Sequence, residues 1–178
     1  MTTMTTNAVE LLKSDHAKVK QLFAQFEAAG EDEKRRGDIF KQIAQELKVH
    51  TTIEEEVFYP AVKKMDSEMA LEAEEEHNIV DWIIAQMKKL SPGDENYDAK
   101  FSTLKENVQH HIEEEEKEMF PEAEKKLGSQ INALGEKMQE RKEALMKRST
   151  ATRSTSTRTR SSGSTRSPSG TRAKSRSR

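Results

Sequence analysis

The stretch HTTIEEEVFYP, from His50 to Pro60, is followed sixty-one positions later by HIEEEEKEMFP, from His111 to Pro121. A histidine, two glutamates and a proline stand at the same offsets in both copies, and an aromatic residue precedes each proline. Four helical steps turn by only about 40°, so Glu54 and Glu115 share a helix face with the histidine before them. The repeat therefore predicts two matching helices, each presenting a His–Glu pair.

Apolar residues spaced by three and four extend outward from these copies and define five helical segments. The first begins at the N-cap residue Asn7 and stops before Gly30, the third begins at Ser67 and closes near Ser91, and the fifth covers roughly residues 129–147. There is no convincing period-two alternation. Short connections favour antiparallel neighbours. The expected fold is all-α: an up-down-up-down four-helix bundle with an appended C-terminal helix.

The charge is divided unevenly along the 178 residues. Residues 1–148 carry 22 basic and 32 acidic side chains, whereas residues 149–178 carry 8 basic and none acidic. The second stretch has no apolar residue larger than alanine, which predicts a disordered Ser/Thr/Arg-rich tail. Such a tail could bind nucleic acid non-specifically through phosphates, or it could simply solubilise the chain or pair with the acidic body.

Several classes of protein are excluded or disfavoured. No apolar run is long enough for a membrane span, so no membrane partner is expected. The N-terminus lacks the pattern of a secretory signal. With no cysteine there are no disulfides or thiolate metal sites, which fits a cytoplasmic location. The oligomeric state is not specified by the sequence.

Histidines interrupt the apolar stripe of four different helices, once in each. They are His16, His50, His77 and His111. An inward carboxylate without a partner costs several kcal/mol, so Glu54 and Glu115 beside these imidazoles indicate a bound cation. His110 shares its face with polar residues, which favours His111 as the ligand.

The predicted ligand set narrows the metal. Imidazole with carboxylate suits iron, manganese or zinc, and six ligands are too many for one tetrahedral zinc with an open position. We expect two metal ions, each held by two histidines and both bridged by Glu54 and Glu115. Glu55 and Glu116 are candidates to hold ligand imidazoles from behind, and the rest of the glutamate runs should be solvated. Pro60 and Pro121 should bend or end their helices.

Four motifs in order resemble the hemerythrin-like, HHE cation-binding family: SDHAKV at His16, HTTIEEEVFYP at His50, EEHNIV at His77 and HIEEEEKEMFP at His111. The resemblance covers roughly residues 7–127. It implies a non-haem, oxo- or hydroxo-bridged centre of two iron ions, one on His16 and His50 and the other on His77 and His111.

The resemblance implies a protein that binds or senses dioxygen, peroxide or nitric oxide, or that buffers iron. The alternatives are a peroxide-decomposing enzyme, for which no separate acid–base residue is evident, and a stress protein that associates with nucleic acid through its tail. Asp81 stands where oxygen-carrying hemerythrins have a further histidine, which argues against simple oxygen carriage. It could ligate a metal, accept a hydrogen bond from a ligand imidazole, or lie at the bundle edge near Trp82.

Overall fold

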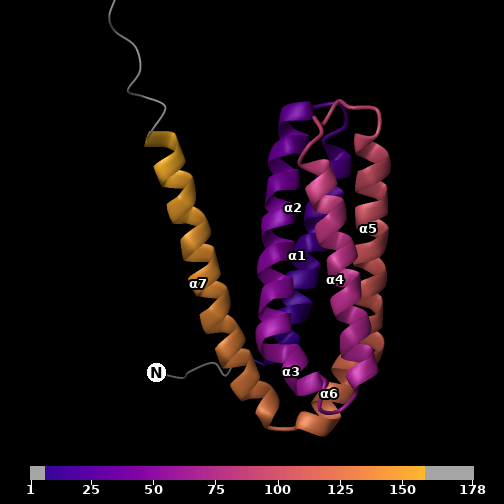
Figure 1. Cartoon of the computed structure of the whole chain (residues 1–178), viewed down its shortest axis with the longest axis vertical. Coiled ribbons are helices and arrows are strands. Elements are labelled where there is room, and N and C mark those ends of the chain that lie inside the picture. The colour runs from indigo at the N-terminus through magenta and orange to yellow at the C-terminus, as the bar shows by residue number, and fades with distance from the viewer. Residues whose placement is uncertain (1–6, 159–178) are drawn as a thin grey trace, which may run out of the picture. The chain divides into compact units, whose positions relative to one another are not determined.

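Four long antiparallel helices make up most of the computed structural model, which describes residues 7–158 and the side chains of residues 7–148. They are α1 (Ala8–Ala28), α2 (Glu33–Ile53), α4 (Ser67–Met87) and α5 (Tyr97–Glu114). Helix α1 packs against α2 and α4 against α5, while α2 also contacts α4. Figure 1 shows the four side by side. The predicted all-α bundle is confirmed, and the described residues contain no strand.

Shorter elements complete the chain. They are η1 (Glu54–Phe58), α3 (Tyr59–Val62), η2 (Glu115–Met119), α6 (Phe120–Leu127) and α7 (Gln130–Arg158). Helix α7 begins where the appended helix was predicted but continues past residue 148, as its alanine and arginine residues allow. The predicted disorder of residues 149–178 falls partly on this helix, and residues 159–178 lie outside the described part of the chain. No helix within residues 7–158 is long and apolar enough to cross a bilayer.

Local capping signals set the helix boundaries. The Asn7 side chain accepts a hydrogen bond from the Val9 N–H at 2.8 Å and starts α1. Asp32 and Asp66 cap α2 and α4 in the same way. Gly30 follows α1 with φ of 55°, a left-handed conformation that favours glycine. These caps fix the first residues of α1, α2 and α4.

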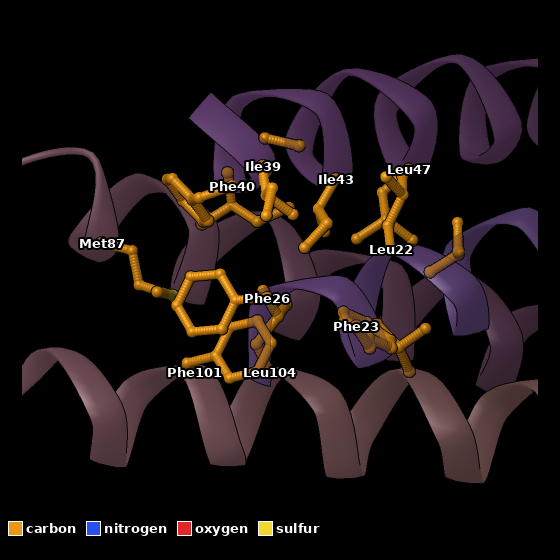
Figure 2. Close-up of a cluster of buried hydrophobic side chains, with 14 of the residues drawn as sticks. Leu22, Phe23, Phe26, Ile39, Phe40, Ile43, Leu47, Met87, Phe101 and Leu104 are labelled. Atoms are coloured by element: carbon orange, nitrogen blue, oxygen red, sulfur yellow. The ribbon is translucent and has the colours of Figure 1, made fainter. Parts of the chain in front are cut away.

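One apolar cluster fills the end of the bundle where α1 ends and α2 begins (Figure 2). The residues labelled in Figure 2 are Leu22, Phe23, Phe26, Ile39, Phe40, Ile43, Leu47, Met87, Phe101 and Leu104. The rings of Phe26 and Phe101 stack with centroids 3.6 Å apart. Each fully buried side chain of this size contributes about 1.5–3 kcal/mol, so this cluster holds the four helices together.

A second apolar cluster lies toward the other end, where α1 begins and α3, α6 and α7 join the bundle. Its fully buried members include Leu12, Ile53, Phe58, Val62, Ala70, Phe120 and Met138. On α1, α2 and α4 a histidine separates the residues of the two clusters, for example His16 between Leu12 and Val19 on α1. A buried polar layer therefore crosses the bundle between two apolar regions.

Both copies of the repeated motif widen into a single π-helical turn. In η1 the Tyr59 N–H donates to the Glu54 carbonyl, five residues back, and in η2 the Phe120 N–H donates to the Glu115 carbonyl. Such turns insert one residue into the helix and are frequent at functional sites. Each turn begins at a glutamate that the sequence predicts to be a metal ligand.

The prolines follow the π turns. Pro60 and Pro121 stand in the first turns of α3 and α6, where the missing N–H of proline is tolerated. The wider turn before each proline accommodates a ring that would otherwise clash with the carbonyl one turn back. Of the two expected effects, bending or ending the helix, an end follows soon after Pro60, since α3 stops at Val62, whereas α6 continues past Pro121 to Leu127.

Candidate metal centre

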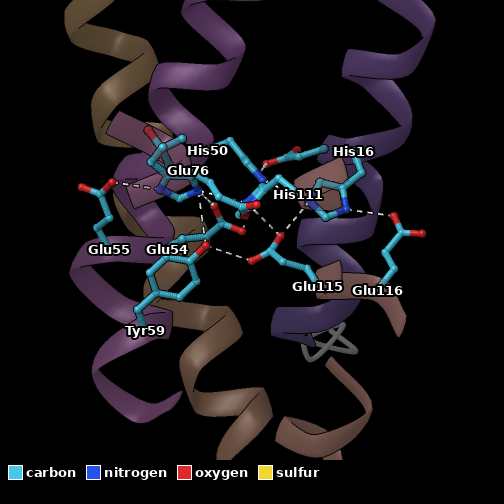
Figure 3. A network of polar contacts seen from close by, with 12 residues as sticks. His16, His50, Glu54, Glu55, Tyr59, Glu76, His111, Glu115 and Glu116 are labelled. Carbon is cyan, nitrogen blue, oxygen red and sulfur yellow. Dashed lines mark hydrogen bonds and ion pairs between the residues drawn. The ribbon is translucent and has the colours of Figure 1, made fainter. Parts of the chain in front are cut away.

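Four buried imidazoles point their Nε2 atoms inward in two pairs. Nε2 of His16 on α1 lies 3.1 Å from Nε2 of His50 on α2. Nε2 of His77 on α4 lies 3.0 Å from Nε2 of His111 on α5. We call these the α1–α2 pair and the α4–α5 pair. Figure 3 shows part of this arrangement in the polar layer.

Two buried glutamates connect the pairs. Oε1 of Glu54 lies 3.2 Å from Nε2 of His50, and its Oε2 lies 3.4 Å from Nε2 of His77. Oε2 of Glu115 lies 3.2 Å from Nε2 of His16 and 3.5 Å from Nε2 of His111. Each carboxylate therefore reaches one histidine of each pair, a position from which it could bridge two cations.

All six residues predicted from the sequence fall into two overlapping groups, whose ligand atoms lie within 4.8 Å of one another. The groups are His16, His50, Glu54 and Glu115, and Glu54, His77 and His111. Both carboxylate oxygens of Glu54 and Oε2 of Glu115 are buried and make no hydrogen bond to a described residue. Buried polar atoms normally have partners, so these oxygens fit a site built for cations.

The two buried carboxyl groups have opposite pKa shifts. Burial and the negative charge of Glu115 raise the pKa of Glu54 well above its ordinary value. For Glu115, burial opposes ionisation, but the charges of His111 and the other nearby imidazoles outweigh it and lower the pKa. Like charges this close repel one another, so the two buried carboxyl groups do not ionise independently in the metal-free site. A bound cation would favour the ionised form of both.

A carboxylate faces the outer nitrogen, Nδ1, of every inward imidazole. The Nδ1–oxygen distances are 2.9 Å for His16–Glu116, 3.6 Å for His50–Asp15, 2.9 Å for His77–Glu55 and 2.7 Å for His111–Glu76. A carboxylate at Nδ1 holds the ring proton there, fixes the ring and leaves the Nε2 lone pair free for a metal. The predicted roles of Glu55 and Glu116 agree with this geometry.

Asp15 and Glu76 were missed by the sequence analysis, which expected Glu76 on a solvated face. Each directly precedes a site histidine, yet it holds the histidine of the neighbouring helix. The two residues are sixty-one positions apart, like the two copies of the repeated motif. The sequence signal that could have identified Asp15 and Glu76 is an acidic residue immediately before the site histidine of α1 and of α4.

Helix α7 contributes to this arrangement. Lys142 forms an ion pair with Asp15, and Arg141 donates to both carboxylate oxygens of Glu56 at 2.6 and 2.8 Å. Burial opposes the charge of Asp15, but the ion pair with Lys142 and the nearby His50 imidazole lower its pKa. Burial lowers the pKa of His50 to about 4, despite the nearby Asp15 carboxylate. The metal-free His50 is therefore a neutral imidazole, as a metal ligand must be.

Tyr59 introduces an asymmetry that the sequence analysis did not identify. Its hydroxyl donates to Oε1 of Glu115 at 2.9 Å and lies 3.3 Å from Nε2 of His77. Burial and the charges of both glutamates raise its pKa well above the ordinary value. At the equivalent position Phe120 stacks on His16 with no hydroxyl. The aromatic residue before each proline, noted in the repeat, was the available signal.

Two residues considered from the sequence lie outside the buried groups. Asp81 is half-exposed and pairs with Lys48 at 2.9 Å, so the structure does not bring it to the histidines. His110 is exposed and lies near Glu76 and Glu114 on the surface. The preference for His111 over His110 agrees with this placement.

Comparison with known proteins shows to which protein family the chain belongs. The family model described as "Hemerythrin HHE cation binding domain" matches residues 7–123. A crystal structure of a hemerythrin HHE cation-binding domain-containing protein, the Rv2633c homolog from Mycobacterium kansasii, superposes with a TM-score of 0.71 at 27% identity, covering 78% of this chain and 86% of that one. The chain belongs to the hemerythrin HHE cation-binding domain family.

Two further relatives are informative. The uncharacterized protein Rv2633c of Mycobacterium tuberculosis is 25% identical over 139 residues, which are 76% of this chain and 84% of the relative. A protein of Nostoc sp. named DNA nickase is 28% identical over 125 residues, 70% of this chain. The match spans only 35% of the nickase, so the two proteins share one part rather than a whole architecture.

Proposed function

We propose that this chain is a non-haem di-iron protein whose paired metal centre binds or senses dioxygen, peroxide or nitric oxide, or buffers iron. The α1–α2 pair and the α4–α5 pair would each hold one iron ion, and Glu54 and Glu115 would bridge the two. The observation that carries the proposal is the position of these carboxylates, each within 3.5 Å of a histidine from both pairs.

The donor set supports iron or manganese over zinc. Four imidazoles and two bridging carboxylates suit a pair of metal ions that accept both nitrogen and oxygen ligands. Iron and manganese both accept such a ligand set, whereas zinc prefers four tetrahedral ligands. The carboxylates at the four Nδ1 atoms would make the imidazoles more basic. Family membership supports cation binding of this kind.

The surroundings suit a small ligand. When bound, the two irons would supply redox chemistry and open coordination positions for a diatomic molecule or peroxide. The apolar clusters on either side of the polar layer exclude bulk water from the bundle interior. The Tyr59 hydroxyl, 2.9 Å from Glu115, is the neutral proton donor nearest to the carboxylates.

Ligand titration tests this proposal. Metal-free protein would be loaded with ferrous ions under argon and titrated separately with hydrogen peroxide, nitric oxide and dioxygen, while near-ultraviolet absorption is recorded. We expect the absorption bands to change with at least one ligand. His111→Ala should lose the response, and Asp81→Asn, a change at a surface ion pair, should retain it. Bands that respond to none of the three would refute the binding function.

A peroxide-decomposing enzyme is the second candidate. It is favoured by Tyr59, whose hydroxyl could donate a proton at the centre, and by a cavity that reaches His111 and Glu115 from outside. Turnover decides between binding and catalysis. Iron-loaded protein should consume peroxide faster than both free iron and the His111→Ala variant. Equal rates would rule out the enzyme.

Nucleic-acid association is a third and separate candidate. It is supported by eight basic residues without an acid in residues 149–178 and by the relative named DNA nickase. A gel-shift comparison of the full chain with a chain ending at residue 148 tests it. Binding by the full chain alone, weakening steeply with salt, would support a role for the tail. Equal binding by both chains would exclude it.

A further inference from the structure

An acidic cavity leads from the surface to the candidate metal centre. It has a volume of about 190 Å³ and lies between α4 with its N-cap residue Asp66, the C-terminal turn of α5, and η2. Its acidic lining residues are Asp66, Glu68, Glu72, Glu76, Glu114 and Glu118. At its inner end it reaches His111 and Glu115, which are buried members of the centre.

Apart from the imidazoles of His110 and His111, which lie near Glu76 and Glu114, the acids of this cavity have no basic partner among the side chains of residues 7–148. Among the described side chains, residues 7–148, no lysine or arginine lies within ion-pair distance of the six acids. Other glutamates on the same helices are paired, as Glu74 is with Lys63 and Glu113 with Lys117. A hollow lined by carboxylates with apolar walls focuses negative potential and concentrates cations.

The outer part of this region contains a third group of potential ligands. Nε2 of His110 lies 3.1 Å from Oε1 of Glu114 and 3.8 Å from Oε1 of Glu76. These three residues offer ligand atoms within 4.8 Å of one another. The second oxygen of Glu76 holds Nδ1 of His111 at 2.7 Å. Glu76 thus faces the outer group and the buried centre at once.

The inner end of the cavity reaches a carboxylate of the candidate metal centre. Glu115 is 1% exposed and lines the cavity. Its Oε2 accepts no hydrogen bond from the described residues. A buried carboxylate oxygen without a hydrogen bond is costly, and here it lies at the end of an acidic hollow that opens to the surface.

We propose that this cavity is the entry route for divalent cations into the bundle. A cation would first bind at Glu76, His110 and Glu114 and then pass along the acidic wall to Glu115 and His111. The proposal rests on the metal centre proposed above. The apolar clusters on both sides of the polar layer would make any path through them prohibitive for a bare ion, whereas the carboxylates replace its water ligands stepwise.

Loading kinetics test the route. Metal-free protein would be mixed with ferrous or cobalt(II) ions under argon in a stopped-flow instrument, and the number of ions bound at equilibrium would be measured separately. The test variant is Glu72→Gln/Glu114→Gln/Glu118→Gln. The control is Glu31→Gln/Glu95→Gln/Glu106→Gln, which removes the same charge from exposed sites elsewhere.

We expect the test variant to load about tenfold more slowly than wild type at low salt, and to lose most of the salt dependence of the rate. The control should stay within about twofold, and all three proteins should bind the same final number of ions. Wild-type rates in the test variant, equal slowing in the control, or a lower final number in the test variant would each overturn the route. A wild-type protein that binds no cation would refute the metal centre itself.

Discussion

The hydroxyl of Tyr59 lies 2.9 Å from Oε1 of Glu115, and it makes the two halves of a nearly symmetric site different. The histidine–carboxylate contacts of the site repeat at sixty-one residues, but Phe120 takes the position equivalent to Tyr59, with a ring that stacks on His16. The two candidate iron positions are therefore not equivalent, since only the side nearer His77 has a proton donor.

Replacing Tyr59 with phenylalanine should change the chemistry of the centre without removing it. The ring would still pack against His77, while Oε1 of Glu115 would lose its hydrogen bond. The metal-free protein should lose about 1–3 kcal/mol of unfolding free energy, and iron-loaded protein should show altered ligand-induced bands with the same iron content. Tyr97→Phe, which removes a buried hydroxyl within the other apolar cluster, is the control and should leave the bands unchanged. Identical spectra for Tyr59→Phe and wild type would contradict a role at the metals.

The carboxylates behind the imidazoles should be needed for tight metal binding. Glu116→Gln removes the charge 2.9 Å from Nδ1 of His16 and weakens control of the ring proton. We expect metal affinity to fall by about 10- to 100-fold, measured by competition with a chelator. The nearby change Glu113→Gln, at an exposed pair with Lys117, should have little effect. Equal affinities for the two variants would show that Glu116 does not tune its histidine.

Lys142 of α7 should affect the centre through Asp15. Lys142→Met keeps the apolar part of the side chain but leaves the Asp15 carboxylate, which is mostly buried, without its cation. We expect a loss of about 1–2 kcal/mol in unfolding free energy and weaker metal binding. Arg141→Met removes a more exposed pair with Glu56 and should cost less, about 0–1 kcal/mol. The reverse order of the two losses would contradict a supporting role for Lys142.

Acid should destabilise the metal-free protein through His50. Burial lowers its pKa from 6.5 to about 4, so between these values the unfolded chain binds a proton that folded His50 does not. The contribution of His50 to the free energy of unfolding is therefore fully present above pH 6.5 and is lost as the pH falls toward 4. The loss would be on the order of 3 kcal/mol, and His111, whose pKa is raised, opposes it.

Denaturant unfolding of the metal-free protein at several pH values checks this prediction. His50→Gln removes the titrating group, so its stability should vary less between pH 6.5 and 4 than that of wild type. A wild-type protein that becomes more stable across this fall in pH would show that Glu54 and His111, whose pKa values are raised, outweigh His50.

The fold could be predicted because each of its determinants is local. Spacings of three and four, the caps at Asn7 and Asp66, and the glycine after α1 are properties of short segments. The inward direction of His50 and Glu54 follows from a four-residue step along one helix. The sequence could not show that π turns begin at both glutamates, because that widening is a compromise among the following proline, the packed aromatic residue and the site.

The supporting contacts of the site could not be read from the sequence for a different reason. Asp15 holds a histidine of α2 and Glu76 one of α5, so each contact depends on how two helices are rotated relative to one another. Within a run such as Glu74–Glu76, helical period alone separates an inward residue from a solvated one only coarsely. The contact between Tyr59 and Glu115 could not be predicted either, because it depends on the π turn before Tyr59 and on how closely α5 approaches it.

Iron content tests the central claim most directly. Protein purified without added metal, then offered ferrous ions under argon and freed of excess, would be analysed for metal per chain. We predict two iron ions per chain for wild type, with a marked loss in a variant that combines Glu54→Ala and Glu115→Ala, the residues placed to bridge both histidine pairs. Fewer than one transition-metal ion per wild-type chain, with no increase after ferrous ions are offered, would contradict the account.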